Sequence, residues 1–325
     1  MKGVVLTGTG GVWRVRTDDG ETVEASLRGR LKKADMDRRA DGGRKRDTVA
    51  AAAGTIKLAV GDEVVLERNE RDDAWAIADI LPRRSQLARR SPGGGVGERV
   101  LAANVDQGVV VIAAARPEPH PRMLDRFLVI AEANELAARV VINKVELVGG
   151  PGAARDRWLD YERAGYPVHY TSAKRGEGID ALHGALAGVV SVLTGPSGVG
   201  KSSLLNSMFP GLDLRVGEIS ESVNKGRHTT VGGYLHPLPG EQGGYVADTP
   251  GLREIGMWAL QPDSLDRCFP ELRPYLDHCR FGDCRHAVEP DCAVRAAVQA
   301  GEVSVRRYES FLKLRGELEG EAPSW

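Results

Sequence analysis

The start of the chain alternates apolar and polar residues in short stretches. Turn residues such as Gly20 and Gly61 separate these stretches, and no convincing helical stripe interrupts them. A period of two between turn signals is typical of short, half-buried strands. The pattern predicts a small β-barrel of the oligonucleotide-binding (OB) kind over residues 1–85. The predicted strands are Val12 to Thr17, Glu21 to Leu27, Glu63 to Glu67 and Ala74 to Leu81.

The middle of the chain has almost continuous apolar runs, which are typical of strands covered on both faces. Helical stripes separate them at Arg122 to Ala138, Ile179 to Leu186 and Ser203 to Phe209. Strands that alternate with helices indicate a parallel, doubly wound sheet, so we expect an α/β domain over residues 98–258. The predicted strands are Val105 to Ala115, Val140 to Ile142, Tyr166 to Tyr170, Val189 to Leu193 and Tyr245 to Ala247.

Two further helices, Asp291 to Ala300 and Val303 to Leu318, predict a helical domain over residues 259–325. Apolar residues are sparse before them, from Leu276 to Pro290, so local burial alone would not order this stretch. The chain is therefore predicted to be multidomain.

Composition limits the partners and the cellular compartment that we expect for the protein. The 325 residues carry a formal net charge of −1, so only local patches argue for nucleic acid. No apolar run approaches the roughly 20 residues of a membrane span, and the start does not resemble a signal peptide. Four cysteines in a chain of this length do not suggest a disulfide framework. We expect a cytoplasmic protein without membrane contact and, lacking a dimerisation stripe, a monomer.

One local patch is strongly basic. Residues Arg28 to Arg46 contain nine Lys and Arg residues and few apolar ones, which predicts a mobile loop. Two interpretations remain open, a contact with a phosphate backbone and a solvated loop. Further arginines that would extend the patch flank a glycine-rich linker, Gly93 to Gly97: Arg83, Arg84, Arg89 and Arg90.

A glycine-rich segment, Gly195 to Ser202, follows an apolar strand and precedes a helical stripe. Glycines allow backbone amides to face an anion, and the helix start adds further unpaired N–H groups. This context favours a phosphate loop over an ordinary turn, with Lys201 reaching the β- and γ-phosphates and Ser202 holding Mg²⁺. The nucleotide-binding residues predicted here are Gly195, Pro196, Ser197, Gly198, Val199, Gly200, Lys201, Ser202 and Ser203.

Two segments after this loop fit a nucleotide switch. Thr230 supplies a hydroxyl for Mg²⁺, and Asp248, at the end of a short strand, would hold the ion or its water. The amide of Gly251 would bond the γ-phosphate, although Asp248 to Gly251 alone is also a good turn.

Three cysteines and one histidine gather within the apolar-poor stretch. Their spacing is Cys279-x4-Cys284-x-His286-x5-Cys292, a donor set that suits structural, tetrahedral Zn²⁺ better than free thiols. Cys268 lies outside the spacing and is expected to pack as a small apolar residue.

Asn143-Lys144 resembles the guanine-reading motif of GTPases, and Ser172-Ala173-Lys174 resembles their second base-contacting loop. Both precede the phosphate loop, as in a circularly permuted GTPase. With a β domain before and a Cys/His cluster behind, the chain resembles the ribosome small-subunit-dependent GTPase family (RsgA). The resemblance implies binding of GTP and GDP through Asn143, Lys144, Val145, Glu146, Ser172, Ala173 and Lys174.

In that family's pattern Asn143 contacts the base, the Lys144 stem packs along it and the Ala173 amide meets the guanine oxygen. The pattern usually ends in aspartate, where this chain has Glu146. A carboxylate still accepts from the guanine N1–H and amino group, so we hypothesise a retained but weaker guanine preference.

Many GTPases place a water-orienting glutamine where this chain has Leu252. We therefore expect slow intrinsic hydrolysis, with His228 either assisting the water or serving only as a loop residue. The predicted catalytic residues are Lys201, His228, Thr230, Asp248 and Gly251.

By resemblance, the leading function is a Mg²⁺-dependent GTPase that binds the small ribosomal subunit, contacts its rRNA and assists its late maturation. An RNA-binding assembly factor that uses GTP as a conformational ligand is the main alternative, and Leu252 keeps it open. A permuted GTPase that serves the large subunit is a third.

Overall fold

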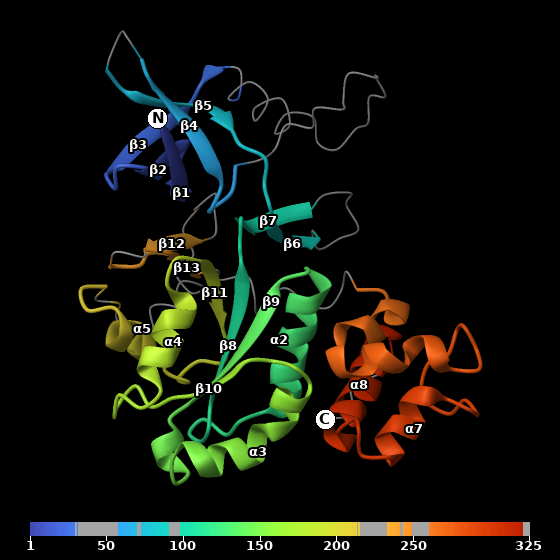
Figure 1. Ribbon diagram of the computed structural model, residues 1–325. Helices are drawn as coiled ribbons and strands as arrows, with labels where there is room; N and C mark the ends of the chain where they lie inside the picture. The colour runs from blue at the N-terminus through green and yellow to red at the C-terminus, as the bar shows by residue number, and fades with distance from the viewer. Residues whose placement is uncertain are drawn as a thin grey trace, which may run out of the picture.

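A computed structural model of the chain shows a barrel, a helix-covered sheet and a helical C-terminal module (Figure 1). This architecture confirms the predicted fold class. The C-terminal module lies beside the helices on one face of the sheet, and the barrel lies beyond one edge of it. The described residues are 1–29, 31, 58–69, 73–90, 98–212, 214, 233–240, 243–248 and 260–320.

The N-terminal barrel closes in the order β1-β2-β3-β5-β4, with β3 and β5 parallel and the other pairs antiparallel. Its core contains Val5, Trp13 and Ile77, each from a different strand. Four of the strands lie on the four stretches predicted from alternation, whereas β1 was not predicted. The bounds are β1 Lys2–Thr9, β2 Val12–Thr17, β3 Thr22–Leu27, β4 Glu63–Arg68 and β5 Trp75–Ile80.

The prediction that Gly93 to Gly97 form a linker is wrong, because paired strands lie on both sides of this stretch. β6 (Gln86–Arg90) and β7 (Glu98–Ala103) flank it and pair as antiparallel strands, so residues 91–97 connect the two strands of one hairpin. The pairing of the flanking strands depends on contacts that local composition does not reveal.

The central sheet has the order β10-β9-β8-β11-β13-β12, and only β12 runs antiparallel to its neighbour. β8 pairs in parallel with β9 and with β11, which is much later in the chain. The carboxyl ends of β8, β9, β10, β11 and β13 therefore lie along one side of the sheet, which we call its carboxyl edge. The bounds are β8 Gln107–Ala113, β9 Ala137–Asn143, β10 Val168–Tyr170, β11 Val190–Thr194, β12 Tyr234–Pro237 and β13 Tyr245–Asp248.

Alternate residues of β8 separate the two faces of the sheet. Val110 and Ile112 pack with the helices α2 (Pro121–Ala133) and α3 (Pro151–Arg163). Val109 and Val111 pack instead with α4 (Ile179–Leu186) and α5 (Lys201–Met208). Every residue of β8 is buried, which explains why this strand has a continuous apolar run.

The helix predicted over Arg122 to Ala138 is too long, because α2 ends at Ala133. The Asn134 side-chain amide donates to the carbonyl of Ile130 (2.7 Å), and Glu135 adopts a positive φ of 55°. Both features end the helix, and β9 then begins at Ala137. The sequence analysis did not assign α3, because its buried residues Ala154, Trp158 and Tyr161 stand among many charged ones.

The C-terminal module begins with 3-10 turns and ends in two helices. Phe269 and Phe311 pack edge to face, 5.5 Å between ring centres, and join its two halves. Among the described residues, no helix is long and apolar enough to cross a membrane. The elements are η3 Pro262–Ser264, η4 Asp266–Cys268, η5 Pro270–His278, α7 Ala293–Gln299 and α8 Val305–Leu318.

A buried polar junction joins the barrel to the sheet domain. The Arg83 guanidinium donates two hydrogen bonds to the fully buried Asp62 carboxylate (2.6 and 2.8 Å). Asn104 donates to the Gly61 carbonyl (2.9 Å) and accepts from the Arg84 amide (2.9 Å). Arg83 is therefore not part of an open basic patch, since its charge is used inside the junction.

We expect Asp62→Asn to destabilise the protein by about 3 kcal/mol, because it breaks a buried ion pair. Asp73→Asn is a matched control, since Asp73 pairs with Arg68 at the surface of the same barrel. Chemical unfolding compares the two variants. Equal stability of both would contradict a structural role for the buried pair.

Candidate nucleotide pocket and metal centre

The glycine-rich segment connects β11 to α5 at the carboxyl edge of the sheet. Gly195 has a φ of 139°, and a Cβ there would lie 2.0 Å from the carbonyl oxygen of Val111 on β8. Gly200 has a φ of 98°, and a Cβ there would lie 2.5 Å from the side-chain nitrogen of Asn143. Only glycine fits these two positions, so the loop lies tightly against β8 and the end of β9.

Lys201 and Ser202 open α5 and are both buried. The Lys201 ammonium donates to the carbonyls of Gly195 (2.9 Å) and Pro196 (3.0 Å), so it lies within the curve of the loop. Backbone amides at the start of a helix and an ammonium inside a glycine-rich loop are groups that bind a polyphosphate.

Asn143, at the end of β9, contacts this loop directly. Its side-chain amide donates to the carbonyl of Val199 at 2.9 Å. Its side-chain oxygen accepts from the Thr171 hydroxyl and the Ala173 amide, both at 3.3 Å. The first base-reading motif thus joins the phosphate loop to the segment after β10, although the chain separates all three.

Lys144 connects the glycine-rich loop to a further segment of the chain. Its ammonium donates to the carbonyl of Gly198 (2.5 Å) and to that of Arg116 (2.6 Å), in the segment between β8 and α2. Its backbone adopts the left-handed region, with φ of 63°. The segments that follow β8, β9, β10 and β11 therefore surround one region of the sheet edge.

Glu146 has one carboxylate oxygen without a partner among the described residues. Its Oε2 atom is inaccessible to solvent and has no hydrogen-bond partner within the described part of the chain. A buried carboxylate oxygen without a donor is unfavourable, and a guanine N1–H or amino group would supply one. The remaining residues of the two motifs differ in burial, since Val145 and Ser172 are buried, Ala173 is half-buried and Lys174 is exposed.

The residues predicted for the switch are largely outside the described residues. His228, Thr230, Gly251 and the water-orienting position Leu252 all fall there. Asp248 is the last residue of β13, whose neighbour β11 leads into the phosphate loop, so its backbone lies at the same edge. Their predicted roles stay predictions.

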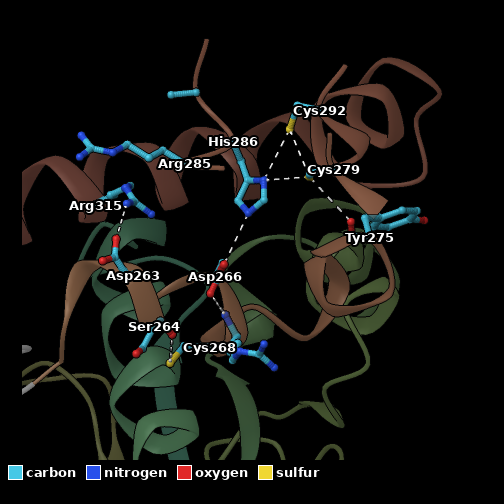
Figure 2. A network of polar contacts seen from close by, with 12 residues as sticks. Asp263, Ser264, Asp266, Cys268, Tyr275, Cys279, Arg285, His286, Cys292 and Arg315 are labelled. Atoms are coloured by element: carbon cyan, nitrogen blue, oxygen red, sulfur yellow. Dashed lines mark hydrogen bonds and ion pairs between the residues drawn. The ribbon is translucent and has the colours of Figure 1, made fainter. Parts of the chain in front are cut away.

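Cys279, Cys284, His286 and Cys292 bring four ligand atoms within 4.8 Å of one another. Figure 2 shows Cys279, His286 and Cys292 of this cluster. The Cys279 and Cys292 sulfurs are 3.9 Å apart, and each lies 3.5 Å from His286 Nδ1. A tetrahedral zinc ion gives about 3.8 Å between two sulfurs and about 3.5 Å between sulfur and nitrogen. The cluster therefore has the dimensions of a metal site.

Residues around the cluster hold the histidine in place. His286 Nε2 lies 3.4 Å from the Asp266 carboxylate, which is the usual outer partner of a metal-binding imidazole, and Figure 2 shows both. The Tyr308 hydroxyl of α8 donates to the His286 carbonyl (2.6 Å). Glu289 lies close to this histidine in the chain and accepts hydrogen bonds from backbone amides, including those of Arg285 and Ala287. Its partial burial alone would raise its pKa, but these hydrogen bonds outweigh the burial and lower the pKa to about 2.

Cys268 is buried and packs in the core, with its sulfur 3.6 Å from the Ser264 carbonyl, as expected for a cysteine outside the cluster. Sequence reasoning missed the Arg116 carbonyl that receives Lys144, because a backbone oxygen has no sequence signature. It also missed Asp266, which lies 20 residues from His286 in the chain, beyond any local motif.

Comparison with known proteins gives consistent matches. The family model described as RsgA GTPase matches residues 80–258. A Gemmatimonas aurantiaca protein named small ribosomal subunit biogenesis GTPase RsgA is 57% identical over 98% of this chain and 97% of its own. A Bacteroides fragilis protein of the same name is 36% identical over the same shares.

Two solved structures resemble the whole chain. The crystal structure of YjeQ from Thermotoga maritima has a TM-score of 0.74 and 33% identity, and the match covers 99% of both chains. The structure of YloQ, titled a circularly permuted GTPase, has a TM-score of 0.70 and 25% identity over 100% of this chain and 96% of that one.

The metal site predicts about one tightly bound metal ion per purified chain. Cys284→Ala should lose the ion and loosen residues 279–292, because few apolar contacts would replace the metal–ligand bonds. Elemental analysis and limited proteolysis measure both effects. Cys268→Ala is the matched control and should keep the metal, and equal metal content in the two variants would contradict the assignment.

Proposed function

The chain belongs to the RsgA GTPase family and is a GTP hydrolase, and on that premise we propose that it binds the small ribosomal subunit and assists its late maturation. The relatives that carry this function in their names match almost the full length of the chain. Hydrolysis to GDP and phosphate would be stimulated by the bound subunit.

One observation carries the nucleotide assignment. Asn143 and Lys144 bond the carbonyls of Val199 and Gly198, so the predicted base-reading motif and the phosphate loop lie side by side. A GTP molecule would bind there with its base at the first segment and its phosphates at the second. The reversed order of the motifs along the chain therefore does not separate their tasks.

At the phosphate end, the loop amides and Lys201 would stabilise the charge that develops on the γ-phosphate during hydrolysis. Ser202 would hold the Mg²⁺ that accompanies GTP, with Thr230 and Asp248 as further ligands. Gly251 would add an amide to the γ-phosphate. Leu252 cannot orient water through a hydrogen bond, so we propose that stimulation comes from the subunit or from His228.

At the base end, the Glu146 carboxylate would accept from the guanine N1–H and amino group, while Asn143 contacts the base and the Lys144 stem packs along it. The Ala173 amide faces the Asn143 oxygen at 3.3 Å, a long hydrogen bond that a guanine oxygen would compete for. The longer side chain of glutamate makes this recognition weaker than an aspartate would.

Two parts of the molecule would contact ribosomal RNA. The barrel has the OB-like closed form. The metal-bearing module exposes Phe281, with the Arg280 guanidinium 5.5 Å from its ring centre, and it also exposes Val288. An exposed ring with a cation beside it is suited to stack on an unpaired base.

We also propose that the metal is a single structural Zn²⁺, because protein side chains supply all four donors. The protein would act as a monomer in the cytoplasm. A zinc-stabilised module and a barrel would then clamp the nucleotide domain between two RNA contacts, with binding weakened by salt as phosphate contacts are lost.

Phosphate release, titrated with purified small subunits, tests the activity. Wild-type protein should turn over slowly alone and faster with subunits, whereas Lys201→Ala should lower the stimulated rate about 100-fold or more. The loss follows because the Lys201 ammonium lies within the curve of the loop, where it would stabilise the developing charge. Lys313→Ala is a control, since Lys313 is exposed on α8 and belongs to no predicted site.

Unchanged turnover in Lys201→Ala would sink the assignment of the catalytic pocket. A rate that subunits leave unaltered would favour the other candidate, an RNA-binding factor for which GTP is only a conformational ligand. Stimulation by large subunits instead would reassign the partner.

Glu146→Ala should raise the Kd for GDP about 10- to 100-fold, because the charged acceptor for the guanine edge is lost, and should leave the Kd for ADP unchanged. Glu146→Asp keeps the carboxylate and should retain or improve the preference for guanine. Competitive nucleotide titration measures all three proteins. Comparable affinities of the wild type for ATP and GTP would overturn guanine recognition by this residue.

A further inference from the structure

Arg307, in the C-terminal helix α8, is 1% exposed although it carries a permanent charge. Its guanidinium donates to the Glu271 carboxylate through Nε (2.6 Å) and Nη2 (3.2 Å), within the C-terminal module. Its Nη1 donates to the Asp125 carboxylate of α2, in the nucleotide domain. One arginine therefore bonds both parts of the molecule at once.

The nucleotide-domain side of this contact is extensive. The Tyr161 hydroxyl of α3 donates to Asp125 (2.9 Å) and lies 3.4 Å from the carbonyl of Pro121, the first residue of α2. Burial, and secondarily the Asp125 carboxylate, raise the pKa of Tyr161 well above its usual value, so the hydroxyl remains a donor. Arg307 and Tyr161 together fix one face and the start of α2.

Three aromatic rings complete the surroundings of the Arg307 side chain, which we call the Arg307 socket. The Arg307 guanidinium lies 5.1 Å from the Tyr161 ring centre, 5.7 Å from that of Tyr166 and 4.7 Å from that of Phe269. Tyr161 belongs to α3, and Tyr166 lies between α3 and β10. A delocalised cation stacked among three rings is a contact that lysine does not reproduce.

Arg307 contacts α2, α3 and the segment that leads into β10, and the segments that adjoin α2, α3 and β10 would form the base end of the nucleotide site. The segment before α2 contains Arg116, whose carbonyl receives Lys144. The segment before α3 contains Glu146, and the segment after β10 contains Ala173. None of these elements carries the phosphate loop, which lies between β11 and α5 on the other helical face.

We propose that Arg307 is a positioning residue for guanine: held in the C-terminal module by Glu271, it fixes α2, α3 and the approach to β10 so that the base-reading segments keep their spacing. This inference rests on the proposed GTP pocket and deepens it. It assigns the C-terminal module a second task besides RNA contact, the support of nucleotide affinity.

The two carboxylates beside Arg307 explain why its substitution would disturb α2. Burial works against the charge of Arg307, but the Asp125 and Glu271 carboxylates outweigh it and raise its pKa above the ordinary value. Without Arg307, two buried carboxylates would face each other, and α2 would separate from the module to solvate Asp125. Displacement of α2 would carry along its N-terminal segment and the carbonyl that holds Lys144.

The test compares Arg307→Lys with Arg315→Lys. Arg315 is a buried arginine of the same helix, but it pairs with Asp263 and Glu319, both within the module (Figure 2 shows the first pair). Arg307→Lys should raise the Kd for GDP and for GTP alike by about fivefold, and Arg315→Lys should leave both unchanged. Fluorescent nucleotide titration measures the affinities, and metal content confirms an intact module.

Steady-state hydrolysis adds a readout that a merely structural defect would not give. Base contacts are the same in the ground and transition states, so the KM for GTP should rise by the same factor while kcat stays within about twofold of the wild type. A fall in kcat at constant KM, an unchanged Kd in folded Arg307→Lys, or an equal loss in Arg315→Lys would each overturn the proposal.

Tyr161→Phe keeps the test decisive if Arg307→Lys does not fold. It removes one hydroxyl and retains the ring, and it should raise the Kd for GDP about two- to threefold, whereas an unchanged Kd would again overturn the proposal. Failure of the proposed function is separately visible. Wild-type protein would then bind or hydrolyse no GTP, whereas failure of this inference alone leaves the wild type active.

Discussion

The hydrogen bond from the Asn143 side chain to the Val199 carbonyl joins two segments that lie 56 residues apart in the chain. It forms because parallel strands end at a common edge, whatever their order along the chain. Gly200 allows the contact, since any side chain there would displace the Asn143 amide. A permuted sequence can therefore rebuild a nucleotide pocket, because strand position in the sheet, and not chain order, decides which loops meet.

The strongest local signals predicted the fold well. Alternation located four barrel strands, a continuous apolar run located β8, and donor spacing located the metal cluster around His286. Features that depend on tertiary partners escaped prediction. The charge of Arg83 suggested a basic patch, yet Asp62 neutralises it inside a junction, and the end of α2 depends on Asn134. The Arg307 socket draws on four distant segments and has no local pattern at all.

The barrel and the C-terminal module contact different sides of the nucleotide domain. The Thr7 hydroxyl of the barrel donates to the Gly233 carbonyl (3.2 Å), immediately before the edge strand β12, and β12 pairs with the strand that ends at Asp248. The C-terminal module packs on α2 and α3. The strand that ends at Asp248 thus lies on the side of the barrel, whereas α2 and α3 lie on the side of the C-terminal module.

The place of Arg307 near the end of the chain bears on biosynthesis. Asp125 and Tyr161 emerge from the translating ribosome long before α8 does. Until that helix arrives, the carboxylate has no cation and is more stable in water than against the tyrosine. The contact that holds α2 against the C-terminal module is therefore completed only after the final helix has been synthesised.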